Sequence, residues 1–296
     1  MIAAIASGKG GTGKTTVSAA LASVWAEALG RPVIAVDLDV EEPNLHLFLR
    51  PTITRTRPAG LEIPVVDPAV CTRCGACRTL CQFGAITILG DTPMVFADMC
   101  HGCGGCLAVC PAGAITAGTR ELGVVEEGTA GDIGFLKGKL RVGEAMSPPL
   151  IRAVMHRLDE IRANDPDMAG RDILCDAPPG VSCPALAAVG QADCIVLVTE
   201  PTPFGIHDFK LAVEAFTPLG KPMGVVVNRA GTDCESFDAF CRQAGLPILA
   251  EIPDDRAVAK AYARGKILAD VNKTYHLLCL GLAASVAKLA GEARHA

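Results

Sequence analysis

The run from Gly8 to Thr15 reads Gly-Lys-Gly-Gly-Thr-Gly-Lys-Thr, and it decides the fold. It follows the apolar stretch Ile2–Ala6 and leads into a helical pattern over Lys14–Leu29, so a strand, a glycine-rich loop and a helix are expected in that order. Glycines let backbone N–H groups turn toward phosphate oxygens, and the helix N-terminus adds its dipole. Lys14 is expected to meet the terminal phosphates, and the Thr15 hydroxyl to bind Mg²⁺. The stretch therefore predicts a nucleotide phosphate site.

Apolar runs of strand length alternate with helical patterns on both sides of a long interruption. Half of the 296 residues are hydrophobic and few are aromatic, which suits a buried parallel sheet packed by alanine-rich helices. We predict an α/β P-loop NTPase fold with a mostly parallel sheet flanked by helices. The expected strands are Ile2–Ala6, Val33–Val36, Asp172–Cys175, Cys194–Thr199, Met223–Val227 and Ile248–Ile252, and the expected helices are Lys14–Leu29, Ile206–Phe216, Ser236–Ala244, Arg256–Ala263 and Tyr275–Leu289.

The interruption, from about Arg50 to Asp167, contains two cysteine runs with the same C-x2-C-x2-C-x3-C spacing. The runs repeat at an offset of 29 residues, and a Gly-Ala-Ile-Thr sequence follows each of them at the same offset. We therefore predict an inserted domain at 64–118 inside a nucleotide-binding domain made of residues 1–63 and 119–296. A strand at Val142–Glu144 and a helix at Ile151–Ile161 are expected to lead back to the main sheet.

This cysteine spacing resembles that of bacterial two-cluster ferredoxins, in which the fourth cysteine of each run ligates the other cluster. The resemblance implies a small α+β ferredoxin-like domain with two [4Fe-4S] clusters. Zinc is the main alternative, because paired C-x2-C knuckles also suit tetrahedral thiolate sites. One departure is that Gln82 stands after the fourth cysteine of the first run, where the second run has Pro111. The implied ligands are Cys71, Cys74, Cys77 and Cys110 for one cluster, and Cys100, Cys103, Cys106 and Cys81 for the other.

A second lysine, Lys9, gives the phosphate loop a cation beyond the one that it needs. With it, the chain resembles the deviant Walker A ATPases, the group that includes MinD, ParA, Mrp and the nitrogenase iron protein. The resemblance implies an ATP-dependent homodimer with ATP at the interface, in which Lys9 crosses to the partner's nucleotide. The alternative for Lys9 is a solvated loop charge.

Three further matches to this family follow predicted strands. Asp37 and Asp39 resemble the first switch, which implies that Asp37 holds Mg²⁺ through water and Asp39 activates the attacking water. Asp176 resembles the Walker B acid near Mg²⁺, and Asn228 the adenine-reading asparagine, with Gly231 favouring ATP over GTP. The implied catalytic residues are Lys9, Lys14 and Asp39, the Mg²⁺ residues are Thr15, Asp37 and Asp176, and the nucleotide-binding residues are Gly8, Gly10, Gly11, Thr12, Gly13, Lys14, Thr15, Thr16 and Asn228.

The composition of the chain limits which binding partners and which cellular compartment we expect. The net charge is -5 with no cluster of Lys or Arg, so we expect no nucleic-acid binding. No signal peptide is visible and the apolar run Leu277–Ala284 is too short to span a bilayer, so we expect a cytoplasmic protein without a membrane partner. Cys183, just past the second switch, could bridge a third cluster between two subunits. Packing accounts for the other cysteines, which are Cys175, Cys194, Cys234, Cys241 and Cys279.

Three functions remain open. In the first, ATP binding and hydrolysis gate electron transfer through the two clusters to a protein partner. In the second, the chain is an ATPase of the Mrp kind that carries or assembles iron–sulfur clusters and delivers them to a partner. In the third, it is a positioning ATPase of the MinD/ParA kind.

Overall fold

The computed structural model describes residues 1–231 and 235–292, so Cys234 lies outside the described residues. The chain forms two compact units. Unit 1 comprises Met1–Arg57, Val125–Lys139 and Ile151–Ala296, and unit 2 comprises Pro58–Val124 and Leu140–Leu150. The boundaries predicted for the insertion, 64 and 118, lie within unit 2 and stay a prediction.

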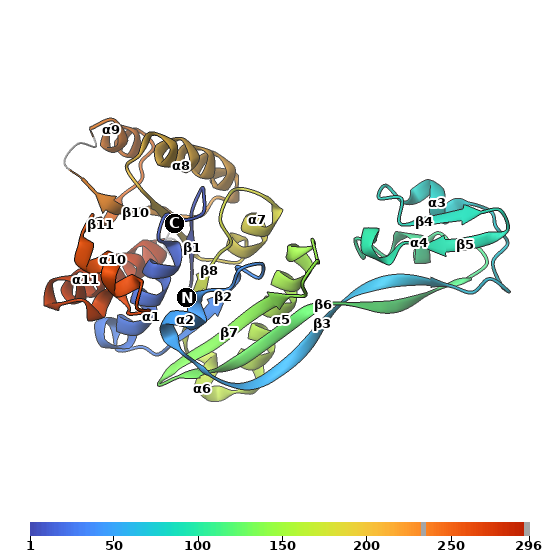
Figure 1. The fold of residues 1–296 in the computed structure, drawn as a ribbon, viewed down its shortest axis with the longest axis horizontal. Coiled ribbons are helices and arrows are strands. Elements are labelled where there is room, and N and C mark those ends of the chain that lie inside the picture. The colour runs from blue at the N-terminus through green and yellow to red at the C-terminus, as the bar shows by residue number, and fades with distance from the viewer. Residues whose placement is uncertain (232–234, 293–296) are drawn as a thin grey trace. The chain divides into compact units, whose positions relative to one another are not determined.

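Unit 1 is built on a sheet whose strands follow the order β11-β10-β9-β1-β8-β2-β7-β6-β3 (Figure 1). Every pair from β11 to β7 is parallel, and four of these strands are almost fully buried, mostly apolar runs, as a sheet covered on both faces requires. The predicted mostly parallel α/β fold is confirmed. The strands are β1 (Ile2–Ala6), β2 (Val33–Asp37), β3 (Thr52–Val66), β6 (Ile115–Ala130), β7 (Ile133–Leu140), β8 (Asp172–Asp176), β9 (Cys194–Thr199), β10 (Met223–Ala230) and β11 (Ile248–Pro253).

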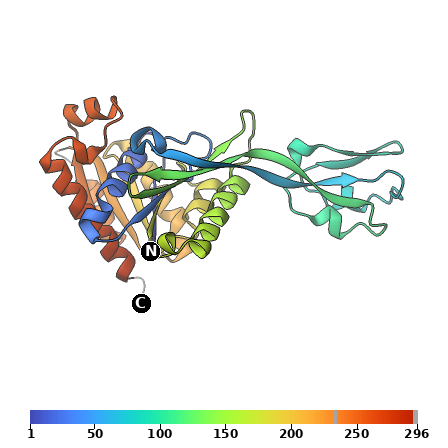
Figure 2. The same cartoon turned by 90° about the horizontal axis from the view of Figure 1, so that it is seen from below.

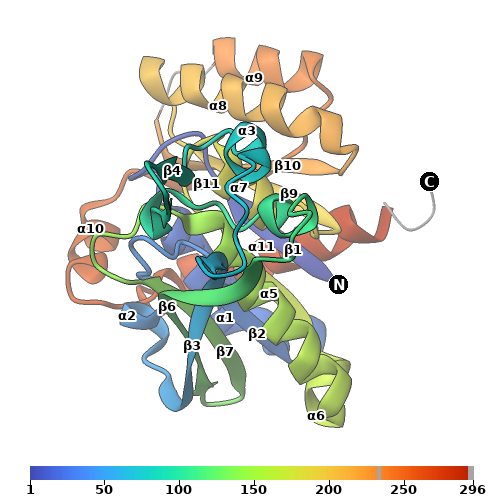
Figure 3. The same ribbon diagram turned by 90° about the vertical axis from the view of Figure 1, so that its right-hand side faces the viewer.

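Helices α1 and α11 lie together on one face of this sheet (Figure 2). Trp25 of α1 and Leu282 of α11 belong to the same core as Val33 and Val196 of the sheet. The chain moves in opposite directions across the sheet after β1 and after β8, so right-handed crossovers place α7, α8 and α9 on the other face. There α8 and α9 lie side by side, with Phe209 and Phe237 ring centroids 5.2 Å apart (Figure 3).

The remaining helices of unit 1 are short or lie at the end of the sheet that carries β7. Their bounds, with those of the helices above, are α1 (Lys14–Leu29), α2 (Leu45–Leu49), α5 (Ser147–Asn164), α6 (Pro166–Ala169), α7 (Cys183–Val189), α8 (Pro203–Phe216), η2 (Thr217–Leu219), α9 (Glu235–Gln243), α10 (Arg256–Tyr262), η3 (Leu268–Asp270) and α11 (Lys273–Glu292).

Strands β3, β6 and β7 lie in the interruption after Arg50, where no regular alternation of strands and helices was expected. The predicted strand at Val142–Glu144 is wrong: Val142 is 99% exposed in a turn, and the strand that joins the main sheet is β7, which pairs with β2 and ends at Leu140. Pro58 and Pro64 lie in β3, which can accommodate them because it is an edge strand. Strands β6 and β7 are joined by two residues and form a hairpin.

Unit 2 contains a one-turn helix within each cysteine run and a two-stranded antiparallel sheet (Figure 1). A buried ion pair between Arg120 and Glu144 attaches the segment 140–150 to the rest of this unit. Its elements, besides parts of β3 and β6, are α3 (Ala76–Leu80), β4 (Ile86–Leu89), β5 (Thr92–Val95), η1 (Ala97–Met99) and α4 (Gly105–Ala108).

Candidate functional site

The phosphate loop of unit 1 lies between β1 and α1, as predicted, and its lysine is already paired. The side chain of Lys14 is only 7% exposed, and its Nζ donates to Asp176 Oδ1 at 2.9 Å. The hydroxyls of Thr15 and Ser18 donate to the same carboxylate at 2.7 and 2.9 Å. Asp176 ends β8 beside the end of β1, so three donors from α1 converge on one acid. Ser18 was not predicted, although it stands one helical turn after Lys14.

Asp37 and Asp39 lie beside this network at the end of β2. Asp37 is fully buried; its two oxygens accept from the backbone N–H groups of Asp39 at 3.1 Å and Leu45 at 2.9 Å. Asp39 Oδ2 lies 3.8 Å from Lys14 Nζ. Burial and then the charge of Asp176 raise the pKa of Asp37 to about 8, and burial raises the pKa of Asp39 to about 6.

These carboxylates suit a divalent cation bound together with phosphates. Burial acts to lower the pKa of Lys14, but Asp176, together with Asp39 and Asp37, raises it above its ordinary value, so Lys14 stays charged. Within residues 1–231 and 235–292, no group of three or more His, Cys, Asp or Glu side chains is arranged to hold a metal by itself. Mg²⁺ commonly takes only one or two protein carboxylates and completes its shell with water and phosphate, so the residues fit this ion.

Lys9 is held by an acid that the sequence did not single out. Its Nζ donates to Glu200 Oε1 at 2.5 Å, and Arg229 Nη1 donates to Oε2 of the same carboxylate at 3.0 Å. The hydrogen bond from Lys9 holds the pKa of Glu200 below its usual range. Glu200 follows β9 and Arg229 lies near the end of β10, so the carboxyl ends of neighbouring strands supply both groups.

Asn228 contacts the phosphate loop from β10. Its Nδ2 donates to the carbonyl oxygen of Thr12 at 2.7 Å. A Cβ on Gly13, whose φ is 95°, would lie 2.2 Å from that nitrogen, so only glycine fits beside Asn228. Asn228 thus positions the loop, and its adenine-reading role stays a prediction.

A cavity of about 420 Å³ opens over these groups, all within unit 1. It brings together most of the predicted nucleotide residues, whereas Gly8, Thr12, Asp37 and Asp176 lie outside its lining; Gly8 packs against the backbone of Asp208. The sequence did not predict the part of the cavity lining that comes from the segment after β2, from the end of β11 and from α10. The lining is Ser7, Lys9, Gly10, Gly11, Gly13, Lys14, Thr15, Thr16, Asp39, Glu42, Asn44, Pro179, Asn228, Arg229, Pro253, Asp254, Asp255, Val258, Ala259 and Tyr262.

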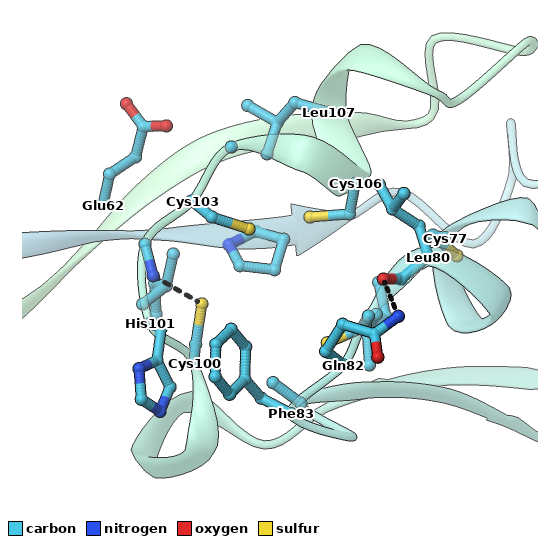
Figure 4. A pocket seen from close by; sticks show the side chains of 17 residues that line it. Glu62, Cys77, Leu80, Gln82, Phe83, Cys100, His101, Cys103, Cys106 and Leu107 are labelled. Carbon is cyan, nitrogen blue, oxygen red and sulfur yellow. Dashed lines mark hydrogen bonds between the residues drawn. The ribbon is translucent and has the colours of Figure 1, made fainter.

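The cysteines of unit 2 line two separate cavities. One, of about 20 Å³, is lined by Cys71, Cys74, Cys77 and Cys110. The other, of about 80 Å³, is lined by Cys81, Cys100, Cys103 and Cys106, together with Cys77 (Figure 4). The smaller cavity therefore draws three cysteines from the first run and one from the second, and the larger cavity draws three from the second run and two from the first.

Backbone N–H groups already point at two of these sulfurs. Gly102 donates to Cys100 Sγ at 3.4 Å and Ala114 to Cys110 Sγ at 3.3 Å. Burial raises the pKa of the Cys77 and Cys106 thiols.

The cysteines outside these two runs that the structure describes do not line either cavity. Burial raises the pKa of Cys175, Cys194 and Cys279 to about 12, which fits the predicted packing role and makes these thiols poor ligands. Cys183 is exposed at the start of α7. Its role as a bridge between subunits stays a prediction.

Residues 3–268 match the family model described as the CobQ/CobB/MinD/ParA nucleotide binding domain. The chain belongs to this family. The match spans both the phosphate loop and the acids at the strand ends, so the predicted membership of the MinD/ParA group of P-loop ATPases is confirmed.

The chain is also similar to curated proteins and to solved structures. An uncharacterized protein of Methanocaldococcus jannaschii is 33% identical over 276 residues, 91% of this chain and 90% of that protein. An uncharacterized ATP-binding protein of the same organism is 26% identical over 270 residues, 88% of this chain and 77% of the relative. The septum site-determining protein MinD of Pyrococcus horikoshii, complexed with Mg-ADP, has a TM-score of 0.59 at 23% identity, covering 99% of this chain and 98% of that one.

Among the three functions left open, these family relationships favour the MinD/ParA-like ATPase. None of the relatives named above is described as an iron–sulfur protein, so the clusters stay a prediction. Over the described residues, α11 is the helix that is long and apolar enough to span a membrane. It packs against α1, with Cys279, Leu282 and Val286 in the core, as a core helix does.

Proposed function

We propose that the chain is an ATP-dependent switch of the MinD/ParA kind that binds ATP with Mg²⁺ in the cavity of unit 1, hydrolyses it, and pairs with a second copy when ATP is bound. The observation that carries the proposal is the convergence of Lys14, Thr15 and Ser18 on Asp176 at the mouth of the phosphate loop. A lysine paired with a buried acid can exchange that acid for phosphate oxygens, which leaves the acid available to a metal ion and its water.

The remaining groups fit the chemistry of phosphoryl transfer. Lys14 would hold the terminal phosphates, and Asp39, which lines the cavity, would accept the proton of the attacking water. Thr15, Asp37 and Asp176 would hold Mg²⁺, which supplies charge stabilisation on the phosphate oxygens. Asp39 is close enough to Lys14 for its protonation to respond to where that lysine goes.

Nucleotide binding and hydrolysis by purified variants test this function. We expect Lys14→Ala to weaken Mg-ATP binding by more than tenfold, since a charge-assisted contact to phosphate is lost. Asp39→Asn should retain binding and lose most hydrolysis. Lys266→Ala, at an exposed lysine outside the cavity lining, is the matched control and should leave both unchanged. Binding of ATP by Lys14→Ala at wild-type affinity would refute the proposed site.

Pairing of two copies needs a separate measurement. The molar mass in solution should double with Mg-ATP in the Asp39→Asn protein, in which slow hydrolysis preserves the ATP state. Lys9→Ala should remain monomeric under the same conditions if Lys9 contacts the partner's nucleotide. A Lys9→Ala protein that pairs as the parent does would remove that role.

A second function is favoured by the grouping of cysteines in unit 2. We propose that the two cavities hold [4Fe-4S] clusters, one on Cys71, Cys74, Cys77 and Cys110 and the other on Cys100, Cys103, Cys106 and Cys81. The support is that each cavity contains three cysteines of one run and the fourth cysteine of the other, with Cys77 lining both cavities, and that N–H groups donate to Cys100 and Cys110. Such clusters would supply one-electron transfer to a protein partner.

Metal and sulfide analysis of protein purified without oxygen tests this second function. We expect about eight iron and eight acid-labile sulfide per chain, and about half of each after Cys110→Ser or Cys81→Ser. Zinc without sulfide would replace the clusters by thiolate zinc sites. Transfer of the iron to an apo-ferredoxin acceptor would favour the carrier function, and its retention would favour electron transfer.

A further inference from the structure

The acid that holds Lys9 has no part in the proposed hydrolysis. Both lysines of the phosphate loop are paired with acids of their own chain, and each acid belongs to a strand beside β1: Asp176 ends β8, and Glu200 follows β9. Asp176 has a second use, because it would serve Mg²⁺ once Lys14 moves to phosphate. Glu200 lies outside the lining of the nucleotide cavity, whereas Lys9 belongs to that lining. Glu200 therefore engages the amine of a cavity residue from outside the cavity.

Glu200 is held rigidly by the start of α8. Its side chain is 10% exposed, and its Oε1 accepts a hydrogen bond from the Thr202 hydroxyl at 3.4 Å. The same hydroxyl accepts from the N–H of Gly205 at 3.0 Å, so Thr202 caps α8 and contacts Glu200 at once. A Cβ on Gly205 would lie 2.3 Å from the backbone oxygen of Glu200, which leaves room for glycine alone. The acid is thus a fixed point beside the phosphate loop.

Lys9 is the partner that can move. Its side chain is 28% exposed and carries its amine on a flexible four-carbon stem. Its backbone is anchored, because the Ser7 hydroxyl donates to the carbonyl oxygen of Lys9 at 2.8 Å. Arg229 Nη1 donates to the other oxygen of Glu200 at 3.0 Å, so the carboxylate keeps a cationic partner when Lys9 leaves. Opening the Lys9–Glu200 pair therefore leaves no buried acid without a partner.

We infer that Glu200 is a positioning residue that keeps Lys9 bound within its own chain, and that Lys9 must leave Glu200 before two copies can pair on ATP. The inference rests on the proposed function, in which Lys9 contacts the partner's nucleotide. Each copy opens one Lys9–Glu200 pair, so the free energy of opening opposes pairing twice in a dimer. Phosphate oxygens that accept from the released amine offset this cost. Glu200 thus restricts pairing to chains that hold a nucleotide.

The affinity of pairing in Mg-ATP tests this role in the full-length protein. The molar mass of Asp39→Asn protein, with and without Glu200→Gln, is measured over a range of protein concentrations. Removal of the charge on Glu200 should make Lys9 available about two- to fivefold more often in each chain, the range of a partly exposed ion pair. Because two pairs open, the dissociation constant of the dimer should fall by about four- to twenty-five-fold.

The matched control is Glu214→Gln, at an exposed acid of α8, which removes the same charge and should leave that constant unchanged. A second combination shows whether Glu200 acts through Lys9: Glu200→Gln with Lys9→Ala should pair no better than Lys9→Ala alone. A third measurement needs no pairing. In protein without nucleotide, Glu200→Gln should accelerate acylation of the Lys9 amine and not that of the exposed Lys266, as peptide mass spectrometry would show.

The possible failures point to different conclusions. Glu200→Gln protein that pairs with the parent's affinity or more weakly, or whose Lys9 is acylated at the parent's rate, would overturn the role of Glu200 and leave the proposed function standing. A general loss of stability would weaken pairing, which is opposite to the expected direction. A parent protein that stays monomeric in Mg-ATP would overturn the proposed pairing as well, so the two failures are distinguishable.

Discussion

Asp176 is the residue on which the nucleotide site depends before any nucleotide arrives. Its carboxylate accepts hydrogen bonds from Lys14, Thr15 and Ser18 and is fully buried. Without Asp176, the buried Lys14 would keep one close acid, Asp39, whose carboxylate lies 3.8 Å from its Nζ. The acid therefore stabilises the fold as well as the site.

We predict that Asp176→Ala lowers the free energy of unfolding of the nucleotide-free protein by about 3–5 kcal/mol, because it breaks a buried ion pair. Denaturant unfolding measures this change. Asp159→Ala, at an exposed acid of α5, is the control and should change stability by less than about 0.5 kcal/mol. The double change Asp176→Ala with Lys14→Ala should cost less than the two single changes together. Equal effects of Asp176→Ala and Asp159→Ala would contradict the prediction.

Glu200 makes stability depend on pH. Its pKa is held below the ordinary value of 4.5 by Lys9 first and by Arg229 in addition. A carboxyl group with a depressed pKa contributes stability that is complete above its unfolded pKa and is lost as pH falls through its folded pKa. The contribution should thus fade on acidification below about pH 5.

We expect the thermal midpoint of the wild-type protein to exceed that of Glu200→Gln at neutral pH, and the difference to shrink as pH falls from about 5 to 3. Thermal unfolding at a series of pH values measures it. Glu214→Gln on α8 serves as the control for generic acid effects. A difference that is constant with pH would show that the Glu200 pair adds no proton-linked stability.

At the scale of elements, the segment 140–150 depends on one buried ion pair. Arg120 of β6 is 9% exposed and pairs with Glu144, whose other oxygen accepts from the N–H groups of Ala145 and Met146. Nε and Nη2 of Arg120 have no hydrogen-bond partner, so the glutamate is its main compensation. The pair fixes the turn that carries Val142.

Glu144→Ala should therefore loosen this segment and leave the main sheet intact. We expect faster hydrogen exchange at Ala145 and Met146 and a lower thermal midpoint, since the buried Arg120 would keep only the exposed Asp98, at 3.7 Å, as an ion-pair partner. Glu121→Ala, at an exposed acid of the same strand, is the control. Unchanged exchange at Ala145 would rule out this role of the pair.

The sequence predicted best the strands whose side chains are buried in an apolar core. The central strands are apolar runs buried on both faces, and their bounds agree with the structure within a few residues. Strand β3 was missed because it lies at an edge and includes Pro58 and Pro64, which read as loop residues. Val142 was placed in a strand because β-branched residues favour strands, whereas Gly143, with a φ of 84°, turns the chain there.

Residues of the nucleotide site were predictable where an acidic residue stands at the end of a buried strand, as Asp37 and Asp176 do. They were not predictable where the partner comes from a distant element. Glu200 is 191 residues from Lys9, and only the sheet order brings β9 beside β1. The wall formed by α10 has no motif, because Tyr262 and Val258 contribute shape rather than charge.

At the scale of the whole molecule, the two candidate sites use separate residues. All residues that line the nucleotide cavity belong to unit 1, and all those that line the cysteine cavities belong to unit 2. Loss of one site should therefore spare the other in the isolated chain.

We predict that the double change Cys74→Ser with Cys103→Ser removes most bound iron and leaves the affinity for Mg-ATP within about twofold of the wild-type value, since neither cysteine lines the nucleotide cavity and substitutions away from a site rarely exceed about 0.5 kcal/mol. Iron analysis and equilibrium nucleotide binding on the same preparation measure both. Cys241→Ala, a buried packing cysteine, controls for general loss of thiols. A tenfold loss of ATP affinity in the double variant would show that the sites are coupled in the single chain.

Unit 2 consists of two separate pieces of chain, Pro58–Val124 and Leu140–Leu150, so the polypeptide passes between the units four times. One proteolytic cut in any of these passages would leave the other three covalent links intact. A nicked molecule should therefore keep both parts on a native gel and separate only when denatured. Excising Pro58–Val124 alone would leave Glu144 without Arg120, so a clean genetic removal of unit 2 must take both pieces at once.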